Sequence, residues 1–259
     1  MKKKFKNVII KARTKKAQIK AHYAFNQDCG FLTTLTLLKL RGTKMGTSKT
    51  NTKEKFNKAI ADVYIAVTPQ GSPIGELDCN ERMIELDSIS NTNLKRDKYF
   101  VWKLLCYALE KSVELRGKQL KFTKEDFGGW SVNGAEFSFS HCNGVLAVVV
   151  SSSPVGVDIE QVGQSRADKL AKRIMTDREI SAFEKVPLDQ KEEAFIKIWT
   201  AKEAIFKSQK SDRFIPRDID TLSHTIKTDI IMINGKKYIW SVATSTPCDV
   251  KIFTDVELT

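Results

Sequence analysis

The sequence has little of what marks membrane-spanning, disulfide-stapled or fibrous proteins. No apolar run approaches the ~18 residues of a membrane-spanning helix, and the longest clean run, Val145 to Val150, has the length of a strand. None of the five cysteines forms a Cys-x-x-Cys metal or redox pair. With only 13 glycines and 6 prolines, the chain is not collagen-like or of low complexity. Because 41% of the residues are hydrophobic, a globular protein with a real core remains.

The cysteine count and the first residues indicate the compartment. An odd number of scattered thiols fits a reducing cytosol better than a secreted disulfide framework. No signal-type apolar core follows the basic N-terminus. Residues 1–27 contain no acidic residue, as in a transit peptide, but they are Lys-rich where transit peptides are Arg-rich and Ser-rich. We therefore expect a cytoplasmic protein with no membrane contact, and an organellar transit peptide is the alternative.

The net charge of +12 is concentrated at one end of the chain. Residues 1–60 hold 16 Lys and Arg against two acids, a net of +14, whereas residues 61–259 hold 27 bases and 29 acids, a net of −2. A nucleic-acid-binding protein that acts through this basic segment is therefore an alternative hypothesis. Residues 1–60 contain no recognised motif or aromatic stacking platform, so we expect a basic, flexible N-terminal extension and regard nucleic acid as an unlikely partner.

Strand and helix patterns alternate without a regular βαβ rhythm, which predicts an α+β fold. Two Asn-Gly pairs, Asn143-Gly144 and Asn234-Gly235, predict tight turns between strands. The expected strands are 62–67, 137–141, 145–150 and 155–160, with a strand meander over 230–256, and the expected helices are 97–115, 166–185 and 189–209.

Two carboxylates share one face of the segment Val155 to Glu160. In an extended strand, its three β-branched residues point to one face, and Asp158 and Glu160 point to the other beside Gly156. Such carboxylates repel each other unless a cation lies between them, and proteins hold Mg²⁺ with one or two carboxylates and substrate phosphates. A solvated polar face of an edge strand is the alternative.

The helix predicted over 189–209 carries charges within and beside its apolar stripe. Lys202 falls in the middle of the stripe, so its ammonium group must reach solvent or find an anion. Glu203 and Lys207 lie four residues apart at the edge of the stripe and share a helix face. The pattern fits an ordinary surface ion pair, or a carboxylate and two ammonium groups that converge on a polyanion such as a phosphate.

These segments together resemble the two-part signature of the 4′-phosphopantetheinyl transferase superfamily. The two parts are Gly156 to Glu160 and Trp199 to Lys207, and the interval of 45 residues from Asp158 to Glu203 fits the spacing of that family. A third block, Phe139-Ser140-His141, precedes the first, as in the larger, pseudo-dimeric Sfp-type class. The resemblance spans residues 62–259 and omits the basic segment.

The resemblance implies two similar α+β halves that form a pseudo-two-fold single chain, with coenzyme A in the cleft between them. Residues 1–60 would then be the N-terminal extension, 61–154 the N-terminal half, and 155–259 the C-terminal half with the metal-binding and catalytic motifs. Because one chain would form a complete cleft, we expect a monomer.

The resemblance also implies roles for the charged residues of the two motifs. Asp158, Glu160 and Glu203 would hold Mg²⁺ against the pyrophosphate of coenzyme A. Lys207 and Lys202 would neutralise phosphate charge. Glu203 would be the general base, with a water on the metal as the alternative, and Lys207 would stabilise the charge that develops during transfer.

A second group of residues would bind the other end of coenzyme A. By the resemblance, His141 with Ser140 contacts the ribose 3′-phosphate, and Arg82 and Lys98 fall near the family's basic contacts to the same phosphate. The chain departs from the family where a Gly-Lys-Pro turn usually docks the adenine end. Its nearest match is Gly128-Gly129-Trp130, so Trp130 would stack on the base instead of a lysine contact.

The reaction implied is transfer of the phosphopantetheine arm of coenzyme A to a serine of an apo acyl or peptidyl carrier protein, with release of 3′,5′-ADP. In such phosphoryl transfer, catalysis consists mainly of positioning and charge stabilisation. An inactive family member that serves as an interaction module is a third hypothesis, and the intact carboxylate and lysine set argues against it.

Overall fold

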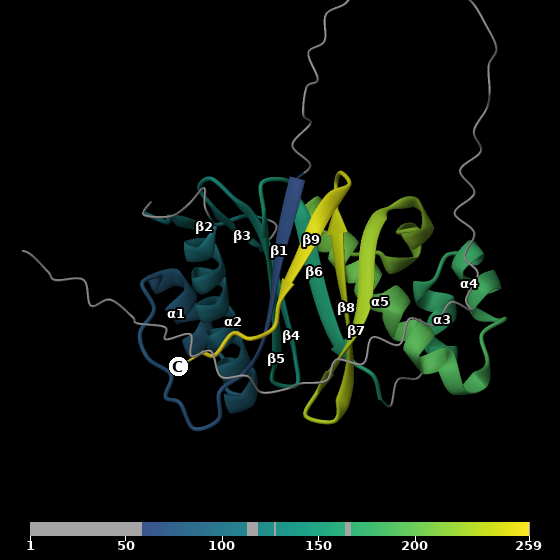
Figure 1. The fold of residues 1–259 in the computed structure, drawn as a ribbon, viewed down its shortest axis with the longest axis horizontal. Coiled ribbons are helices and arrows are strands. Elements are labelled where there is room, and N and C mark those ends of the chain that lie inside the picture. The colour runs from purple at the N-terminus through teal and green to yellow at the C-terminus, as the bar shows by residue number, and fades with distance from the viewer. Residues whose placement is uncertain (1–58, 113–118, 127, 164–166, 259) are drawn as a thin grey trace, which may run out of the picture. The chain divides into compact units, whose positions relative to one another are not determined.

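The computed structural model describes residues 59–112, 119–126, 128–163 and 167–258, which form an α+β fold (Figure 1). The prediction of mixed helices and sheets is therefore confirmed. The basic segment, which was expected to be a flexible extension, lies outside the described residues except for Ala59 and Ile60, which begin the first strand.

The first sheet contains four strands in the order β4-β5-β1-β9. Its strands are β1 (Ala59–Val67), β4 (Glu136–Cys142), β5 (Val145–Ser151) and β9 (Cys248–Phe253). One face is covered by α2 (Thr92–Lys111), beside which lie α1 (Asn80–Asp87) and the small hairpin of β2 (Phe122–Lys124) and β3 (Trp130–Val132) (Figure 1). β1 and β4 thus pair with the two edges of β5, every residue of which is buried, as its β-branched run predicted.

The second sheet contains three strands in the order β6-β8-β7. Its strands are β6 (Val155–Gln161), β7 (Thr225–Ile233) and β8 (Lys236–Thr244). The long helix α5 (Lys191–Gln209) covers its outer face. The remaining elements are α3 (Ala167–Ile174), α4 (Asp177–Phe183) and three short 3₁₀ turns, η1 (Leu188–Gln190), η2 (Pro216–Asp218) and η3 (Thr221–Ser223).

The helix predicted over 166–185 is two helices. Thr176 interrupts it because its side chain accepts from the amide of Glu179 at 3.3 Å, while the carboxylate of Glu179 accepts from the amide of Thr176 at 2.8 Å. This capping box starts α4 afresh. The predicted helix 189–209 agrees with α5, which is preceded by η1.

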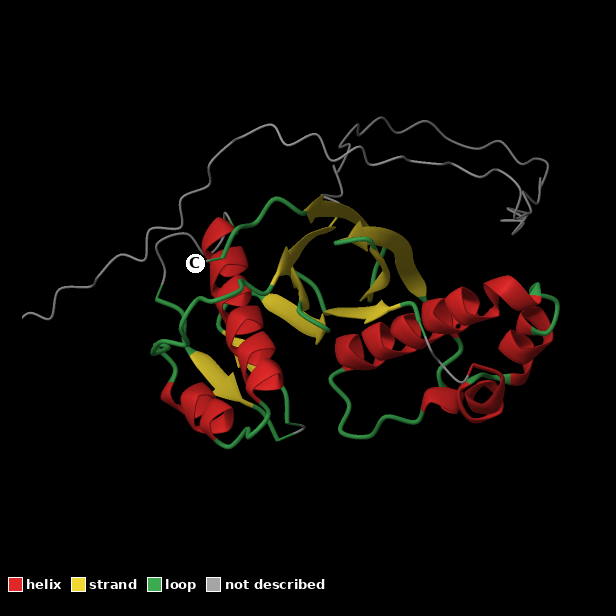
Figure 2. Cartoon of the chain, turned by 90° about the horizontal axis from the view of Figure 1, so that it is seen from below, coloured by secondary structure: helices red, strands yellow, loops and turns green. Residues whose placement is uncertain are grey.

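The two sheets face each other and enclose an apolar layer between them (Figure 2). Side chains of alternate residues on β1, β5, β6 and β8 fill this layer, among them Val63, Val149, Val157 and Val242. The other face of the first sheet packs against α2, and the other face of the second packs against α5. The order of layers is helix, sheet, sheet, helix.

Both predicted Asn-Gly turns are present. Asn143 and Gly144 have φ angles of 49° and 79°, and Asn234 and Gly235 have φ angles of 49° and 74°. Successive positive φ values suit the twist of antiparallel strands joined by a two-residue loop. The first turn joins β4 to β5 and the second joins β7 to β8.

The C-terminal tail is not the single meander that the sequence indicated. β7 and β8 form the expected hairpin, but β9 crosses to the first sheet and pairs in parallel with β1, with Ala59 opposite Cys248. β5 pairs with one edge of β1, and β9 pairs with the other edge. Cys248 and Val250 of β9 also pack against the layer between the sheets, which explains why β9 joins the first sheet.

Gly156 lets β6 lie directly against the backbone of α5. A Cβ atom at this position would be 2.0 Å from the carbonyl oxygen of Ala204 and 2.6 Å from the amide nitrogen of Ser208. The glycine is therefore required by space and brings Asp158, two residues further along β6, beside the last turns of α5.

Replacement of Gly156 by alanine is expected to lower the free energy of unfolding by about 1–3 kcal/mol or more, because the added methyl group must displace backbone atoms. Urea unfolding measures this change. Gly75→Ala is the matched control, since its Cβ would meet only the Tyr99 hydroxyl at 3.3 Å. Equal unfolding free energies for the two variants would contradict the close approach.

Candidate active site

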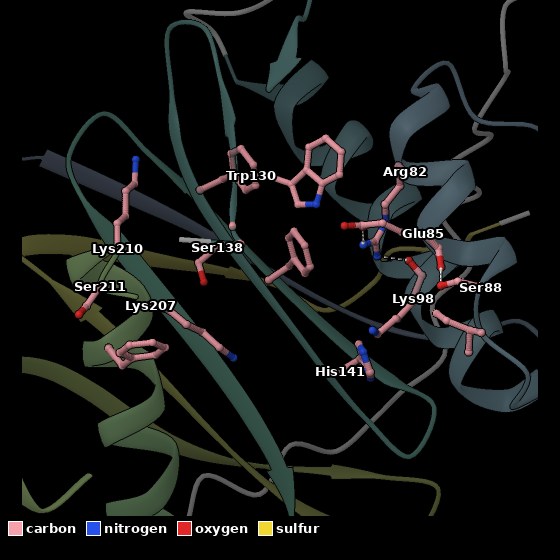
Figure 3. A pocket seen from close by; sticks show the side chains of 16 residues that line it. Arg82, Glu85, Ser88, Lys98, Trp130, Ser138, His141, Lys207, Lys210 and Ser211 are labelled. Carbon is pink, nitrogen blue, oxygen red and sulfur yellow. Dashed lines mark hydrogen bonds and ion pairs between the residues drawn. The ribbon is translucent and has the colours of Figure 1, made fainter. Parts of the chain in front are cut away.

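A cleft of about 530 Å³ lies between α5 on one side and α1 and α2 on the other (Figure 3). Lys207 and Lys210 approach it from α5 and the residue after it, while Arg82 and Lys98 approach from α1 and α2 on the opposite side. His141 of β4 lies toward the wall formed by α1 and α2. Basic side chains from both sides thus face one cavity, which suits an anionic ligand.

β4 of the first sheet lies beside β6 of the second along a seam, and Ser138 of this seam lines the cleft. The two strands are joined by side chains instead of a backbone ladder. The β4–β6 seam consists of three pairs, Ser138 with the Val157 amide at 3.1 Å, Ser140 with Asp158 at 2.7 Å, and Cys142 with Glu160 at 3.1 Å. The spacing of two residues along each strand follows from the alternation of side chains.

Asp158 is the most enclosed carboxylate of the site, with 4% of its surface exposed. Its Oδ1 accepts from the Ser140 hydroxyl at 2.7 Å and from the Lys207 ammonium group at 2.8 Å. Its Oδ2 is buried and has no hydrogen-bond partner. A buried carboxylate oxygen without a donor is costly, and a cation or a ligand donor would satisfy it. The alternative of a solvated edge-strand face does not hold for Asp158.

Glu160 and Glu203 both interact electrostatically with Asp158 and Lys207. Burial raises the pKa of Glu203 to about 7; Lys207 opposes this shift, while the charges of Asp158 and Glu160 add to it. Burial also raises the pKa of Glu160, although the Cys142 thiol that donates to it acts in the opposite direction. The three carboxylates therefore crowd negative charge that one ammonium group only partly offsets.

The carboxylates are not arranged as a finished metal site. Within the described ranges, no group of three or more His, Cys, Asp or Glu side chains is placed so that it could hold a metal ion. The Lys207 ammonium group and the Cys142 thiol instead occupy one oxygen each of Asp158 and Glu160. The donor set still has the chemistry of a Mg²⁺ site, since carboxylate oxygens are its preferred ligands and one of them lacks a partner.

The opposite wall holds the residues expected at the 3′-phosphate. Arg82 is 5% exposed, and its guanidinium group pairs with Glu85 at 2.9 Å and donates to the Lys98 carbonyl at 2.9 Å (Figure 3). Burial lowers the pKa of Arg82 to about 10. Burial also lowers the pKa of His141, against the raising effect of Asp97. Burial thus favours the neutral form of the imidazole.

Lys202 does not join the cleft, contrary to the expectation that it neutralises phosphate charge. Its side chain is completely buried, and its ammonium group pairs with Glu179 at 2.7 Å. The same group donates to the carbonyl oxygens of Pro216, at 2.9 Å, and Ile219. Of the two outcomes that the helical stripe left open for Lys202, solvent or an anion, the structure shows an anion, and this anion is the carboxylate of Glu179 on α4.

Ser140 lies at the β4–β6 seam and donates to Asp158, so its present contact is with the carboxylate. Trp130 lines the cleft as expected but is 7% exposed, with its ring edge-on to Trp102 at 5.0 Å. Sequence reasoning missed Ser138 and the ion pair of Lys210 with Glu136 at 2.6 Å. The alternation of Ser138, Ser140 and Cys142 on one strand face was the available signal for the seam.

Part of the chain is similar in sequence to known proteins. A family model of the 4′-phosphopantetheinyl transferase superfamily matches residues 154–246, which contain β6, α5 and the seam carboxylates. The chain is similar to this superfamily over that segment, which is less than half of its length. The matched segment includes neither the basic residues 1–60 nor the wall with Arg82 and Lys98. The nucleic-acid alternative depends on residues that are outside this segment and are almost all outside the described ranges.

Curated relatives carry the same family name. A 4′-phosphopantetheinyl transferase of Bacillus subtilis is 30% identical over 93 residues, 36% of this chain and 40% of that protein. HetI of Nostoc sp. is 33% identical over 98 residues, 35% of this chain and 41% of that protein. Sfp of Bacillus subtilis is 22% identical over 148 residues, 56% of this chain and 62% of that protein. The matches therefore span less than two thirds of these relatives.

Two further observations concern the helices and the cysteines of the described residues. No helix in the described part of the chain is both long and apolar enough to cross a membrane. Four of the five cysteines lie within the described residues, and all four are free thiols: Cys79, Cys106, Cys142 and Cys248.

Burial of Glu203 is expected to make the protein less stable as pH rises. Because the pKa of Glu203 is raised from 4.5 to about 7 in the folded state, the folded protein binds more protons between these values. Ionisation of Glu203 in that window therefore favours unfolding. Thermal unfolding from about pH 5 to about pH 8 should show Glu203→Gln gaining stability relative to the parent protein as pH rises.

Glu184→Gln, at an exposed position after α4, serves as the control for loss of one negative charge. A constant difference between Glu203→Gln and the parent protein across the window would rule out the raised pKa.

Proposed function

We propose that the protein transfers the 4′-phosphopantetheine group of coenzyme A to a serine of an apo acyl or peptidyl carrier protein and releases 3′,5′-ADP. The observation that carries the proposal is a cleft lined by Lys207 on one side and by Arg82, Lys98 and His141 on the other. Lys207 also contacts the buried carboxylate of Asp158 at 2.8 Å. This arrangement offers cationic contacts at two separate places, as a ligand with a diphosphate and a distant monophosphate requires.

The topology supports the proposal of two similar halves. β4-β5-β1 and β7-β8-β6 repeat one strand order, and in each half the first strand is followed by helices and then by a hairpin. We place the halves at residues 61–154 and 155–259, after a basic N-terminal extension of residues 1–60. Among the described residues, the β2–β3 hairpin and β9 depart from the repeat: the hairpin has no counterpart in the second half, and β9 belongs to the second half but pairs with β1.

The charged residues suggest how coenzyme A lies in the cleft. Lys98 and His141 would bind the ribose 3′-phosphate, and Arg82, which is largely buried, would contribute mainly by charge and by support of Lys98 through its carbonyl. Lys207 would bind the diphosphate beside Asp158. A phosphate near His141 would raise the pKa of the imidazole and stabilise its protonated form.

Mg²⁺ is part of the proposal because the carboxylates fit it chemically. Asp158, Glu160 and Glu203 would hold the ion, and the partnerless Oδ2 of Asp158 is the observation that supports this. When bound, Mg²⁺ would neutralise charge on the diphosphate. The ammonium group of Lys207 would then be released from Asp158 toward phosphate oxygens, where it stabilises developing charge.

Glu203 is proposed to accept the proton of the carrier serine. Its pKa of about 7 in the free protein suits a general base at physiological pH. Binding of a cation beside it would lower this pKa, so a neighbouring water is the alternative acceptor.

The partners proposed are coenzyme A and an apo carrier protein, with no membrane and no nucleic acid. A cleft formed within one chain supports a monomer. Free thiols at all four described cysteines support a reducing, cytoplasmic compartment.

The transfer assay is direct. The full chain is incubated with coenzyme A, Mg²⁺ and an apo carrier protein, and the carrier is weighed by intact-mass spectrometry. We expect a gain of one phosphopantetheine group. Asp158→Asn should reduce the rate at least ~100-fold, because transition-state charge stabilisation is lost. The control is Asp229→Asn on the outer strand β7.

An unmodified carrier in the presence of the parent protein would overturn the proposed function. Transfer by Asp158→Asn at the parent rate under saturating Mg²⁺ would overturn the metal role while leaving the function in place.

His141 should affect coenzyme A binding more than turnover. His141→Ala is expected to raise the KM for coenzyme A about 10-fold, since a charge-assisted hydrogen bond is lost, and to leave kcat nearly unchanged. The KM for 3′-dephospho-coenzyme A should change much less. His224→Ala, at an exposed histidine outside this cleft, is the control. Equal effects on both nucleotides would remove His141 from the 3′-phosphate.

A further inference from the structure

Lys202 and Glu179 form an ion pair that is cut off from water on every side. The side chains are 0% and 2% exposed, and their charged atoms are 2.7 Å apart. The three ammonium hydrogens of Lys202 are matched by three acceptors, one oxygen of Glu179 and the carbonyl oxygens of Pro216 and Ile219. The pair is therefore fully satisfied, as a buried charge must be.

Glu179 connects three segments through its two oxygens. Oε2 accepts from the Thr176 amide at 2.8 Å as well as from Lys202, and Oε1 accepts from the amide and the hydroxyl of Thr221 at 2.9 and 2.7 Å. The N-terminus of α4, the turn η3 and the middle of α5 are thereby held at one point. These hydrogen bonds lower the pKa of Glu179 against the opposite effect of burial.

Lys202 of this ion pair lies close in sequence to the residues proposed for catalysis, Glu203 and Lys207. Glu203 follows Lys202 directly, and Lys207 lies just over one turn further along α5. Successive helical residues differ by 100° about the axis, so a fixed direction for Lys202 also fixes the directions of Glu203 and Lys207. The carbonyls that Lys202 binds follow the segment with Lys210 and Ser211, both of which line the cleft.

Stability alone does not account for such a pair. Desolvation of two charges commonly offsets their attraction, and apolar residues of similar size often serve equally well in a buried site. What an ion pair adds is direction, because each hydrogen bond has a preferred geometry that an apolar contact lacks.

We propose that Glu179 and Lys202 are positioning residues that fix the rotation of α5, so that Glu203 and Lys207 face β6. The proposal rests on the proposed transferase function for its kinetic readout. Neither side chain touches the cleft, and both act through α5. Loss of the pair is expected to let α5 rotate or shift slightly, which separates Lys207 from Asp158 while the remaining apolar contacts keep the fold.

The test uses the double variant Glu179→Leu with Lys202→Met, which leaves no unpaired buried charge. Its circular dichroism and thermal midpoint should show a folded protein at the assay temperature. We expect kcat for carrier modification to fall about 100-fold, because small displacements of catalytic groups have effects of this size. The KM for coenzyme A should stay within about 3-fold, since the residues proposed for the 3′-phosphate lie on the other wall.

A second readout does not depend on transfer. Mn²⁺, followed by electron paramagnetic resonance in the presence of coenzyme A, should bind the double variant at least about 10-fold more weakly than the parent protein. The matched control is Phe183→Leu. Phe183 is a buried residue of α4 in the apolar cluster that α3, α4 and α5 form, so its replacement should lower stability and leave the ion pair intact. Well below its unfolding temperature, this control should keep the parent kcat and Mn²⁺ affinity.

A folded double variant with parent kcat and parent Mn²⁺ affinity would overturn the positioning role. If the double variant does not fold, Glu179→Gln, which keeps the shape and loses the charge, takes its place with the same criteria. If the parent protein itself transfers nothing, the proposed function fails, and Mn²⁺ affinity alone decides the positioning role.

Discussion

The contact between Gly156 and the backbone of α5 is the constraint on which the arrangement of this site depends. With no side chain between them, strand and helix approach until the Ala204 carbonyl and the Ser208 amide occupy the space where a Cβ would lie. Only at this separation does Lys207 reach Asp158 at 2.8 Å and the Val157 carbonyl at 3.2 Å. The smallest residue of β6 thus determines how the charged residues beside it meet.

The β4–β6 seam completes this geometry from the side of the first sheet. In a backbone ladder, the N–H and C=O groups of the two strands would hydrogen-bond with each other. Side chains join them here, and the hydroxyl of Ser140 and the thiol of Cys142 are aimed at Asp158 and Glu160. The same bonds that connect β4 with β6 therefore orient the carboxylates. Structural cohesion and the chemistry of the site depend on a common set of atoms.

The sequence predicted features that local patterns determine and missed those that depend on distant partners. Alternation along β6 identified its two faces, and the Asn-Gly pairs identified both hairpins. Helical spacing showed that Lys202 faces inward, but it could not choose between a phosphate and Glu179, which lies on another helix. The placement of β9 was missed because a short strand has the same local pattern beside β7 or beside β1.

The parallel pairing of β9 with β1 links the first and the last strands of the described chain, and this has a consequence for the order of folding. The outer edge of β1 stays open until residues 248–253 have been synthesised, so the first sheet cannot be completed by the residues before β6 alone. Contacts between such distant residues slow folding because a long loop must close first. The two sheets are therefore interdependent in assembly: a polypeptide cut between β5 and β6 would leave the first sheet without its edge strand β9.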